Sequence, residues 1–299
     1  MSRRHLLMLA VLALIWGASF LFIKVALREL EPITVAGGRI GLAALVLAVV
    51  VPLVLGGRRT IVELRRFAVP LVVVGMLNTA VPFWLLSWGE TRIDSGLAAI
   101  IQAAVPIFIA VLAFGFFPAE RVVGLRLAGV LVGFVGVALL VGAQPRGEVL
   151  GALAVVGMAA CYAIGSLVAG RSLAGAPPLA IAFGTTLAAA VVTVPPALAE
   201  APRELPGWKV LASVVVLGVV GTAVAYLLYF ALIAGAGASR AGLVTYLVPP
   251  VALVYGIVLL DEQIDLAAVV GLVLILAGVA LGSRSRTAAG SRAGASVER

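Results

Sequence analysis

Ten long apolar segments, separated by short polar stretches, fill almost the whole chain. The hydrocarbon core of a bilayer is about 30 Å thick, and an α-helix needs about 20 apolar residues to cross it. The segments come close to that length and lie at 6–27, 33–55, 67–88, 94–117, 125–142, 149–169, 179–199, 210–232, 239–260 and 265–283. This pattern predicts an all-α membrane protein with ten transmembrane helices, whose connections are too short to contain a soluble domain.

Composition indicates that lipid surrounds the chain, and it excludes several kinds of chemistry. Hydrophobic residues make up 63% of the 299 and charged residues 11%, whereas a soluble domain carries about 25% charged residues. Cys161 is the only cysteine, so no intrachain disulfide can form. His5 is the only histidine and precedes the first span. A His/Cys metal site and a Ser-His-Asp triad are therefore excluded, and we expect no metal and no cofactor.

The chain contains the same pattern twice. At a shift of about 143 residues, with small slips, ordered matches cover most of both halves: Pro32 with Pro178, Thr79 with Thr222, Pro106 with Pro249, Glu120 with Glu262, and Gly136 to Leu139 with Gly278 to Leu281. We therefore predict a cytoplasmic leader (1–5), a five-helix repeat (6–142), a second five-helix repeat (149–283) and a disordered cytoplasmic tail (284–299).

An odd number of crossings in each repeat means that the second repeat must enter the membrane from the opposite side. The prediction is thus two inverted-topology five-helix repeats, an arrangement that recurs in secondary transporters. Two similar halves in opposite orientation can form two conformations of similar energy, one open to each side of the membrane.

The distribution of basic residues indicates the orientation. With a cytoplasmic N-terminus, fourteen of the 21 Lys and Arg residues lie in inside segments and five in outside segments, while ten of the 13 acidic residues lie outside. Cytoplasmic loops of membrane proteins carry such an excess of Lys and Arg. We predict that both termini are cytoplasmic. The net charge of +8 is then explained by topology, and no nucleic acid partner is expected.

Two basic residues lie within predicted spans, where each costs about 2.5–3.5 kcal/mol on insertion scales. Arg39 lies about 10 Å into the second span and is flanked by Gly37, Gly38 and Gly41. One hypothesis is that it faces a central cavity and neutralises an anionic group of a substrate. A structural contact to helix-end carbonyls or to an acidic loop residue is equally open. Lys24 lies close to a helix end and can also extend to the interface.

None of the ten predicted spans contains an Asp or Glu deep in the membrane. Proton- and sodium-coupled carriers often use such a carboxylate. The sequence therefore leaves facilitated diffusion, exchange, or coupling through another group.

Prolines near the middle of two corresponding spans point to a binding site. Pro106 lies in 94–117, and Pro249 and Pro250 lie in 239–260. Proline removes a backbone donor and kinks a helix, and interrupted helices at matching positions mark the substrate site of many carriers. A role in packing alone is the alternative. Substrate-binding candidates besides Lys24 and Arg39 are the amphipathic residues Trp16, Asn78, Trp84, Gln102, Tyr162, Tyr226 and Tyr246, although aromatic residues at helical spacing are as often packing residues.

Gly129 and Gly133 form a Gly-xxx-Gly motif. This motif brings helices into close contact, either within one chain or between two copies. A homodimer is therefore one interpretation of this surface.

The chain resembles EamA-type carriers of the drug/metabolite transporter superfamily. The resemblance rests on Trp16-Gly17-Ala18-Ser19, on Arg39, and on the proline-containing helix that is followed in each half by Glu120 or Glu262 and a span ending Gly-Val-Ala-Leu. It covers residues 6–282. It implies a multi-pass carrier of the bacterial inner membrane, often an exporter of amino acids or related small metabolites. A non-transporting membrane subunit and a membrane-embedded enzyme are the alternatives, but the spans contain no reactive constellation for an enzyme.

Overall fold

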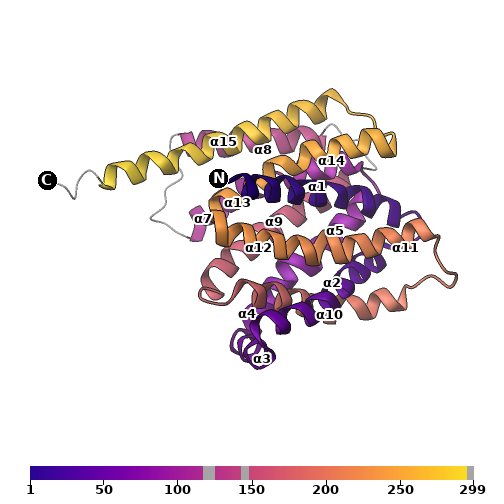
Figure 1. Cartoon of the computed structure of the whole chain (residues 1–299). Helices are drawn as coiled ribbons and strands as arrows, with labels where there is room; N and C mark the ends of the chain where they lie inside the picture. Colours follow the sequence, from indigo (N-terminus) through magenta and orange to yellow (C-terminus); the bar gives the residue numbers. More distant parts are fainter. Residues whose placement is uncertain (117–124, 143–147, 295–299) are drawn as a thin grey trace.

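The structure is a computed structural model that describes residues 1–116, 125–142 and 148–294. Within these ranges the chain is a bundle of helices (Figure 1). Seven of the helical segments are long and apolar enough to cross a membrane, and three shorter apolar helices, 127–142, 244–260 and 266–281, complete the ten predicted spans. The predicted all-α membrane fold is therefore confirmed.

Each half of the chain contributes five spans in the same order. The first half consists of α1 (Arg3–Ala26), α2 (Pro32–Leu55), α4 (Ala68–Gly75) with η1 (Met76–Ala80) and α5 (Val81–Glu90), α6 (Ser95–Gln102) with α7 (Val105–Phe116), and α8 (Leu125–Gly142). The second consists of α9 (Val149–Ser172), α10 (Pro178–Ala199), α11 (Trp208–Val215) with η2 (Val216–Val224) and α12 (Ala225–Ala236), α13 (Ala238–Ala241) with α14 (Val244–Leu260), and α15 (Leu266–Gly294).

Corresponding helices of the two repeats pack against one another. α2 packs against its counterpart α10, and α8 packs against its counterpart α15, at opposite edges of the bundle (Figure 1). Between these pairs, α1 packs on α14 and η2, while its counterpart α9 packs on α6, α7 and α5. These contacts of one repeat thus have equivalents in the other, as expected for two-fold related repeats.

Glycines explain how α8 and α15 come so close. A Cβ added to Gly278 would lie 2.7 Å from the backbone nitrogen of Gly133, and one added to Gly136 would lie 3.0 Å from the carbonyl oxygen of Gly271. Side chains at these positions would therefore separate the two helices. Gly129 also lies against Gly278. The Gly-xxx-Gly motif is thus used in a contact within the chain, which removes the sequence argument for a homodimer on this surface.

Two π-helical segments lie at corresponding places in the repeats. η1 contains Thr79 and η2 contains Thr222, which the sequence repeat had paired. The hydroxyl of Thr222 donates to the carbonyl of Leu217 at 2.9 Å, a bond to the residue five positions earlier that suits the wider helix. π-Helical turns are rare and are often found at functional sites. These two face the middle of the bundle, where the repeats meet.

The prolines have different surroundings in the two halves. In the first half, the helix is interrupted at Ala103 and Ala104, and Pro106 is the second residue of the helix that follows. In the second half, the interruption lies at Gly242 and Leu243, and the chain then continues through Pro249 and Pro250 inside α14. Pro249 is buried and Pro250 is exposed. The break in the second half therefore precedes the proline by more than one turn.

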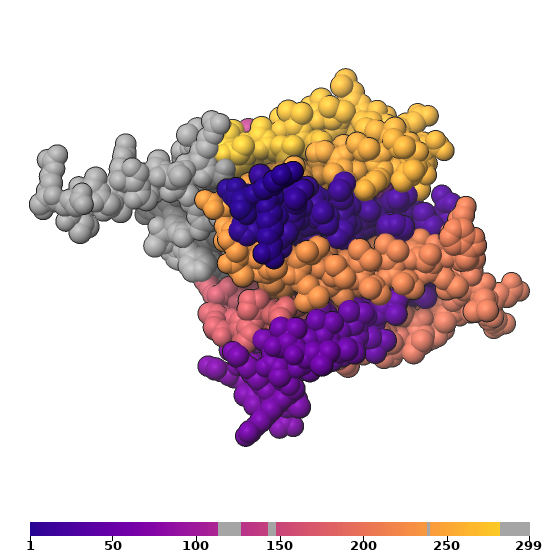
Figure 2. Space-filling view, viewed as in Figure 1, coloured from indigo at the N-terminus to yellow at the C-terminus, as the bar shows by residue number. Residues whose placement is uncertain are grey.

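Two features at the ends of the bundle differ from the sequence prediction. The short helix α3 (Gly57–Arg66) lies between the second and third spans and projects from one corner (Figures 1 and 2). α15 is helical to Gly294, beyond the predicted boundary at 283, whereas a disordered tail was predicted from 284. Extending a formed helix requires no new nucleus, so an alanine-containing segment can continue it. α1 begins at the end of the bundle where α15 finishes (Figure 1).

Candidate substrate-binding site

Arg39 is buried where the two repeats meet. It lies on α2, is 5% exposed, and reaches across to η2 of the other repeat. Its Nε donates to the hydroxyl of Thr222 at 2.8 Å, and its Nη2 donates to the carbonyl of Gly221 at 3.4 Å. Its guanidinium carbon lies 4.0 Å from the centre of the Phe83 ring. Arg39 therefore connects three spans through its hydrogen bonds and this cation–π contact.

The surroundings of Arg39 follow the repeat symmetry. Phe83 on α5 and Tyr226 on α12 are separated by the same offset as Thr79 and Thr222. Arg39 contacts Phe83 and Thr222, while the Tyr226 phenol lies beside Thr79. Each π-helix thus has a threonine, and each is followed one turn later by an aromatic ring. Arg39 itself has no charged counterpart, because the corresponding residue is Thr185.

The hydrogen bonds described leave part of the guanidinium unused. A guanidinium has five N–H donors in a planar fork, and the hydrogen bonds described use two of its nitrogens. No acidic side chain in the described ranges forms a salt bridge with Arg39. The phenols of Tyr162 and Tyr226 lie within electrostatic range of it. The carbonyl that Arg39 contacts lies within η2 and not at a helix end, and the guanidinium keeps donors that these bonds do not use.

Lys24 holds the end of the third span. Its Nζ donates to the main-chain carbonyls of Glu90 and Ile93, each at 2.8 Å. The Glu90 carbonyl belongs to the last turn of α5 and the Ile93 carbonyl lies just beyond it, where no intrahelical donors remain. Lys24 therefore contacts helix-end carbonyls and lines the wall of a pocket, and it does not extend into solvent.

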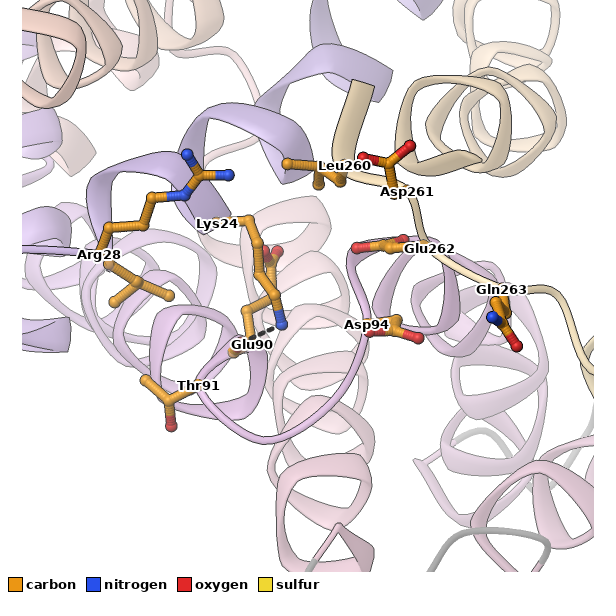
Figure 3. Close-up of a pocket in the computed structure, with 10 residues that line it drawn as sticks. Lys24, Arg28, Glu90, Thr91, Asp94, Leu260, Asp261, Glu262 and Gln263 are labelled. Atoms are coloured by element: carbon orange, nitrogen blue, oxygen red, sulfur yellow. Dashed lines mark hydrogen bonds between the residues drawn. The ribbon is translucent and has the colours of Figure 1, made fainter. Parts of the chain in front are cut away.

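A pocket of about 520 Å³ opens at the end of the bundle beside Lys24. Figure 3 shows Lys24, Arg28 and Glu90 on one wall and Asp94, Asp261 and Glu262 on the other. Four of these six side chains are acidic and two are basic. The pocket is at the end that the sequence predicts to be extracellular, and its acidic excess favours cations over anions there.

Glu262 lines the pocket and caps the N-terminus of α6. Its two carboxylate oxygens accept from the backbone nitrogens of Ser95 at 2.8 Å and Gly96 at 3.0 Å. The chain turns towards α6 because Asp261 adopts a left-handed conformation (φ 57) and the N–H of Glu262 bonds to the carbonyl of Gly256 at 3.1 Å. The residue that carried the family resemblance in the second half is thus a helix cap. Its counterpart Glu120 lies outside the described residues.

Asp94 lies at the rim of this pocket, directly before α6. Partial burial of its carboxyl, together with the negative charge of Glu262, raises the pKa of Asp94 above its ordinary value. No side-chain hydrogen bond from Asp94 caps the helix. The cap is provided by Glu262, and Asp94 is a second negative charge beside it.

The other predicted residues have separate surroundings. The ring of Trp16 lies 5.4 Å from that of Tyr229, and both pack on the core. Trp84 is 41% exposed and lines a different pocket with Trp88. The side-chain oxygen of Asn78 is buried without a hydrogen-bond partner. Gln102 and Tyr246 lie half-buried near the helix interruptions. The structure brings Arg39, Tyr162 and Tyr226 together and leaves the remainder outside that cluster.

Sequence reasoning did not single out Phe83, Thr79 or Glu90 for these sites, whereas it placed Thr222 on one helix face with Tyr226. The two threonines were visible as a repeat match, but nothing indicated π-helices around them. Glu90 lies two residues past the predicted end of the third span at 88, whereas the helix continues to Glu90 and buries it completely. The third span therefore ends in a buried carboxyl group, although the sequence placed Glu90 outside that span.

Comparisons with known proteins agree with this architecture. The model of the EamA-like transporter family matches residues 3–142 and 149–284, once for each repeat. An uncharacterized transporter of Archaeoglobus fulgidus is 28% identical, over 94% of this chain and 99% of that protein. A probable amino-acid metabolite efflux pump of Escherichia coli is 25% identical, over 93% of this chain and 94% of that protein.

A solved crystal structure shares the fold. It is 21% identical to this chain, superimposes with a TM-score of 0.65, and the match covers 94% of this chain and 96% of the other. The duplicated match to one family model explains the two-fold packing of the helices. The chain is a multi-pass membrane protein that belongs to the EamA-like transporter family.

Proposed function

We propose that this chain exports amino acids or related small organic metabolites across the bacterial inner membrane by alternating access. The observation that carries the proposal is Arg39, a buried cation with unused donors at the junction of two inverted repeats. A planar guanidinium suits a carboxylate group, which it can bind through two parallel hydrogen bonds. The similarity to a probable amino-acid metabolite efflux pump supports the same substrate class.

The cluster around Arg39 suits a site that opens alternately to the two sides. Arg39 joins α2 to η2, so a substrate carboxylate that draws the guanidinium away would also loosen a contact between the repeats. In this proposal, binding at Arg39 and relative movement of the repeats are one event.

The test is flux through purified protein in liposomes, with each proteinogenic L-amino acid tested singly. Arg39→Gln should abolish flux, and Arg39→Lys should reduce it strongly, because a single ammonium cannot replace the planar fork. Arg203→Gln is the matched control, since Arg203 is exposed on the loop before α11. A folded Arg39→Gln protein with full flux would show that Arg39 is only structural. Activity that requires a partner protein would favour the membrane-subunit alternative.

The proposed orientation places both termini in the cytoplasm and the Glu204 loop outside. After replacement of Cys161, Glu204→Cys should react with an impermeant maleimide in intact cells. Arg58→Cys on α3 should react only after permeabilisation. The opposite labelling pattern would reverse the orientation.

A further inference from the structure

Glu90 is a completely buried carboxyl group that the contacts of the fold leave unused. It is 0% exposed, and neither of its carboxylate oxygens has a hydrogen-bond partner. It nevertheless lines the pocket at the end of the bundle, beside Lys24 and across from Glu262 (Figure 3). Native proteins rarely leave a buried polar group unpaired, so each such group calls for an explanation.

The surrounding structure holds Glu90 in place without satisfying it. α5 and α9 approach closely at this level, because a Cβ on Gly89 would lie 3.0 Å from the carbonyl oxygen of Gly151. Lys24 comes from α1 and bonds to the main-chain carbonyl of Glu90, so its charge lies near the carboxyl without pairing with it. An ionised carboxylate buried without hydrogen bonds carries a large desolvation cost. A neutral carboxyl group avoids most of that cost.

Four charged groups face Glu90. They are Lys24 on α1, Arg39 on α2, Glu262 after α14, and Asp94 at the pocket rim. The two cations favour ionisation and the two acids oppose it. Burial also opposes ionisation, so the enclosed side chain favours its neutral form, and exposure of the carboxyl group to water would favour ionisation.

We propose that Glu90 is the proton-binding site of this carrier, protonated through the outer pocket and ionised again when the carrier opens to the cytoplasm. The proposal rests on the transport function proposed above. A proton from the outer solution adds to the carboxylate while the outer pocket is open, and the same proton leaves to the cytoplasm after the carrier has opened inward. In an exporter, such a cycle exchanges a proton for the substrate.

A proton fits this site better than a metal cation. Both oxygens of Glu90 are enclosed, which leaves no position for the six or more oxygen ligands that hard cations often require. No group of three His, Cys, Asp or Glu side chains within the described part of the chain could hold a metal ion. A proton needs a single carboxyl oxygen and no coordination sphere.

The first experiment is flux in liposomes with an imposed pH gradient, using the same L-amino acid panel. With one proton exchanged per substrate, a gradient of about one pH unit should sustain a substrate gradient of about tenfold. Glu90→Gln mimics the neutral carboxyl and should remove this dependence. Glu204→Gln, an acid-to-amide change on an exposed loop, should retain it. Gradient-driven flux that persists in Glu90→Gln, or flux driven by a sodium gradient in place of a pH gradient, would overturn the proposal.

The second experiment does not depend on transport. Infrared spectroscopy of the purified protein should show the carbonyl band of a protonated carboxyl group at neutral pH, absent in Glu90→Gln and present in Glu204→Gln. If Glu90→Gln does not fold, Glu90→Asp should shift the band. Absence of the band from folded wild-type protein overturns the proposal. If no amino acid is transported but the band behaves as expected, the substrate proposal fails and the protonation site stands.

Discussion

Removal of the Glu262 carboxylate should destabilise the whole carrier, because this one side chain joins the two repeats. Glu262 follows the C-terminal end of α14, and its carboxylate oxygens accept from the first two backbone N–H groups of α6 at 2.8 and 3.0 Å. Ser95 is fully buried, so its N–H would lose its partner without gaining full access to water. Hydrogen bonds to charged groups contribute about 1.5–3 kcal/mol each, and helix caps about 0.5–2 kcal/mol.

We expect Glu262→Ala to lower the free energy of unfolding by about 2–3 kcal/mol, since the half-buried carboxylate position admits some water. Glu262→Gln keeps one acceptor and should cost about 1 kcal/mol. At about 2–4 °C per kcal/mol, Glu262→Ala should lower the Tm by about 4–12 °C. The assay is thermal unfolding in detergent at a fixed scan rate.

Two further variants separate the cap from other effects. Asp261→Asn is the control, because it removes a neighbouring charge while asparagine tolerates the left-handed conformation at this position. Gly256→Ala should reproduce part of the loss, because its new methyl group would collide with the Glu262 carboxylate. The double variant with Glu262→Ala should then fall short of the sum of the single effects. An unchanged Tm in Glu262→Ala would refute the assignment of this residue as a cap.

Three other predictions follow from the packing and the electrostatics. Gly278→Val should force α15 away from α8 and lower the free energy of unfolding by about 1–3 kcal/mol or more. The loss should appear as a lower Tm or as aggregation on size-exclusion chromatography. Gly142→Ala is the control and should be tolerated, because no atom lies within 4 Å of the added Cβ. Asp94→Asn should raise the Tm at neutral pH. The raised pKa of Asp94 means that the folded protein holds the proton more tightly than the unfolded chain, so ionisation of Asp94 lowers the stability as the pH rises from about 3.9. The advantage of asparagine should therefore shrink as the pH is lowered towards that value. An advantage independent of pH would show that the charge is not its cause. Thr222→Val removes the hydroxyl that accepts from Arg39, so it should lower the free energy of unfolding by about 1–3 kcal/mol and reduce flux. Thr222→Ser keeps the hydroxyl and should retain both stability and flux. Equal behaviour of the two variants would argue against the hydrogen bond.

The hydrophobic pattern of the sequence was sufficient for the spans and their duplication, because lipid imposes the length of an apolar helix and an ancient repeat leaves matched residues. It also marked Arg39, since a cation inside an apolar segment stands out. The same reasoning placed Lys24 close to a helix end, where its ammonium does meet helix-end carbonyls.

Tertiary structure alone decided which of these residues act together. Arg39 and Thr222 are far apart in the chain, and only the crossing of α2 with η2 brings them into contact. Hydropathy ended the third span at 88 because a glutamate lowers the local average, yet α9 and Lys24 cover that last turn and bury Glu90. Composition records how apolar a segment is, but burial depends on what packs against it, and that is set by contacts between segments that are distant in the sequence.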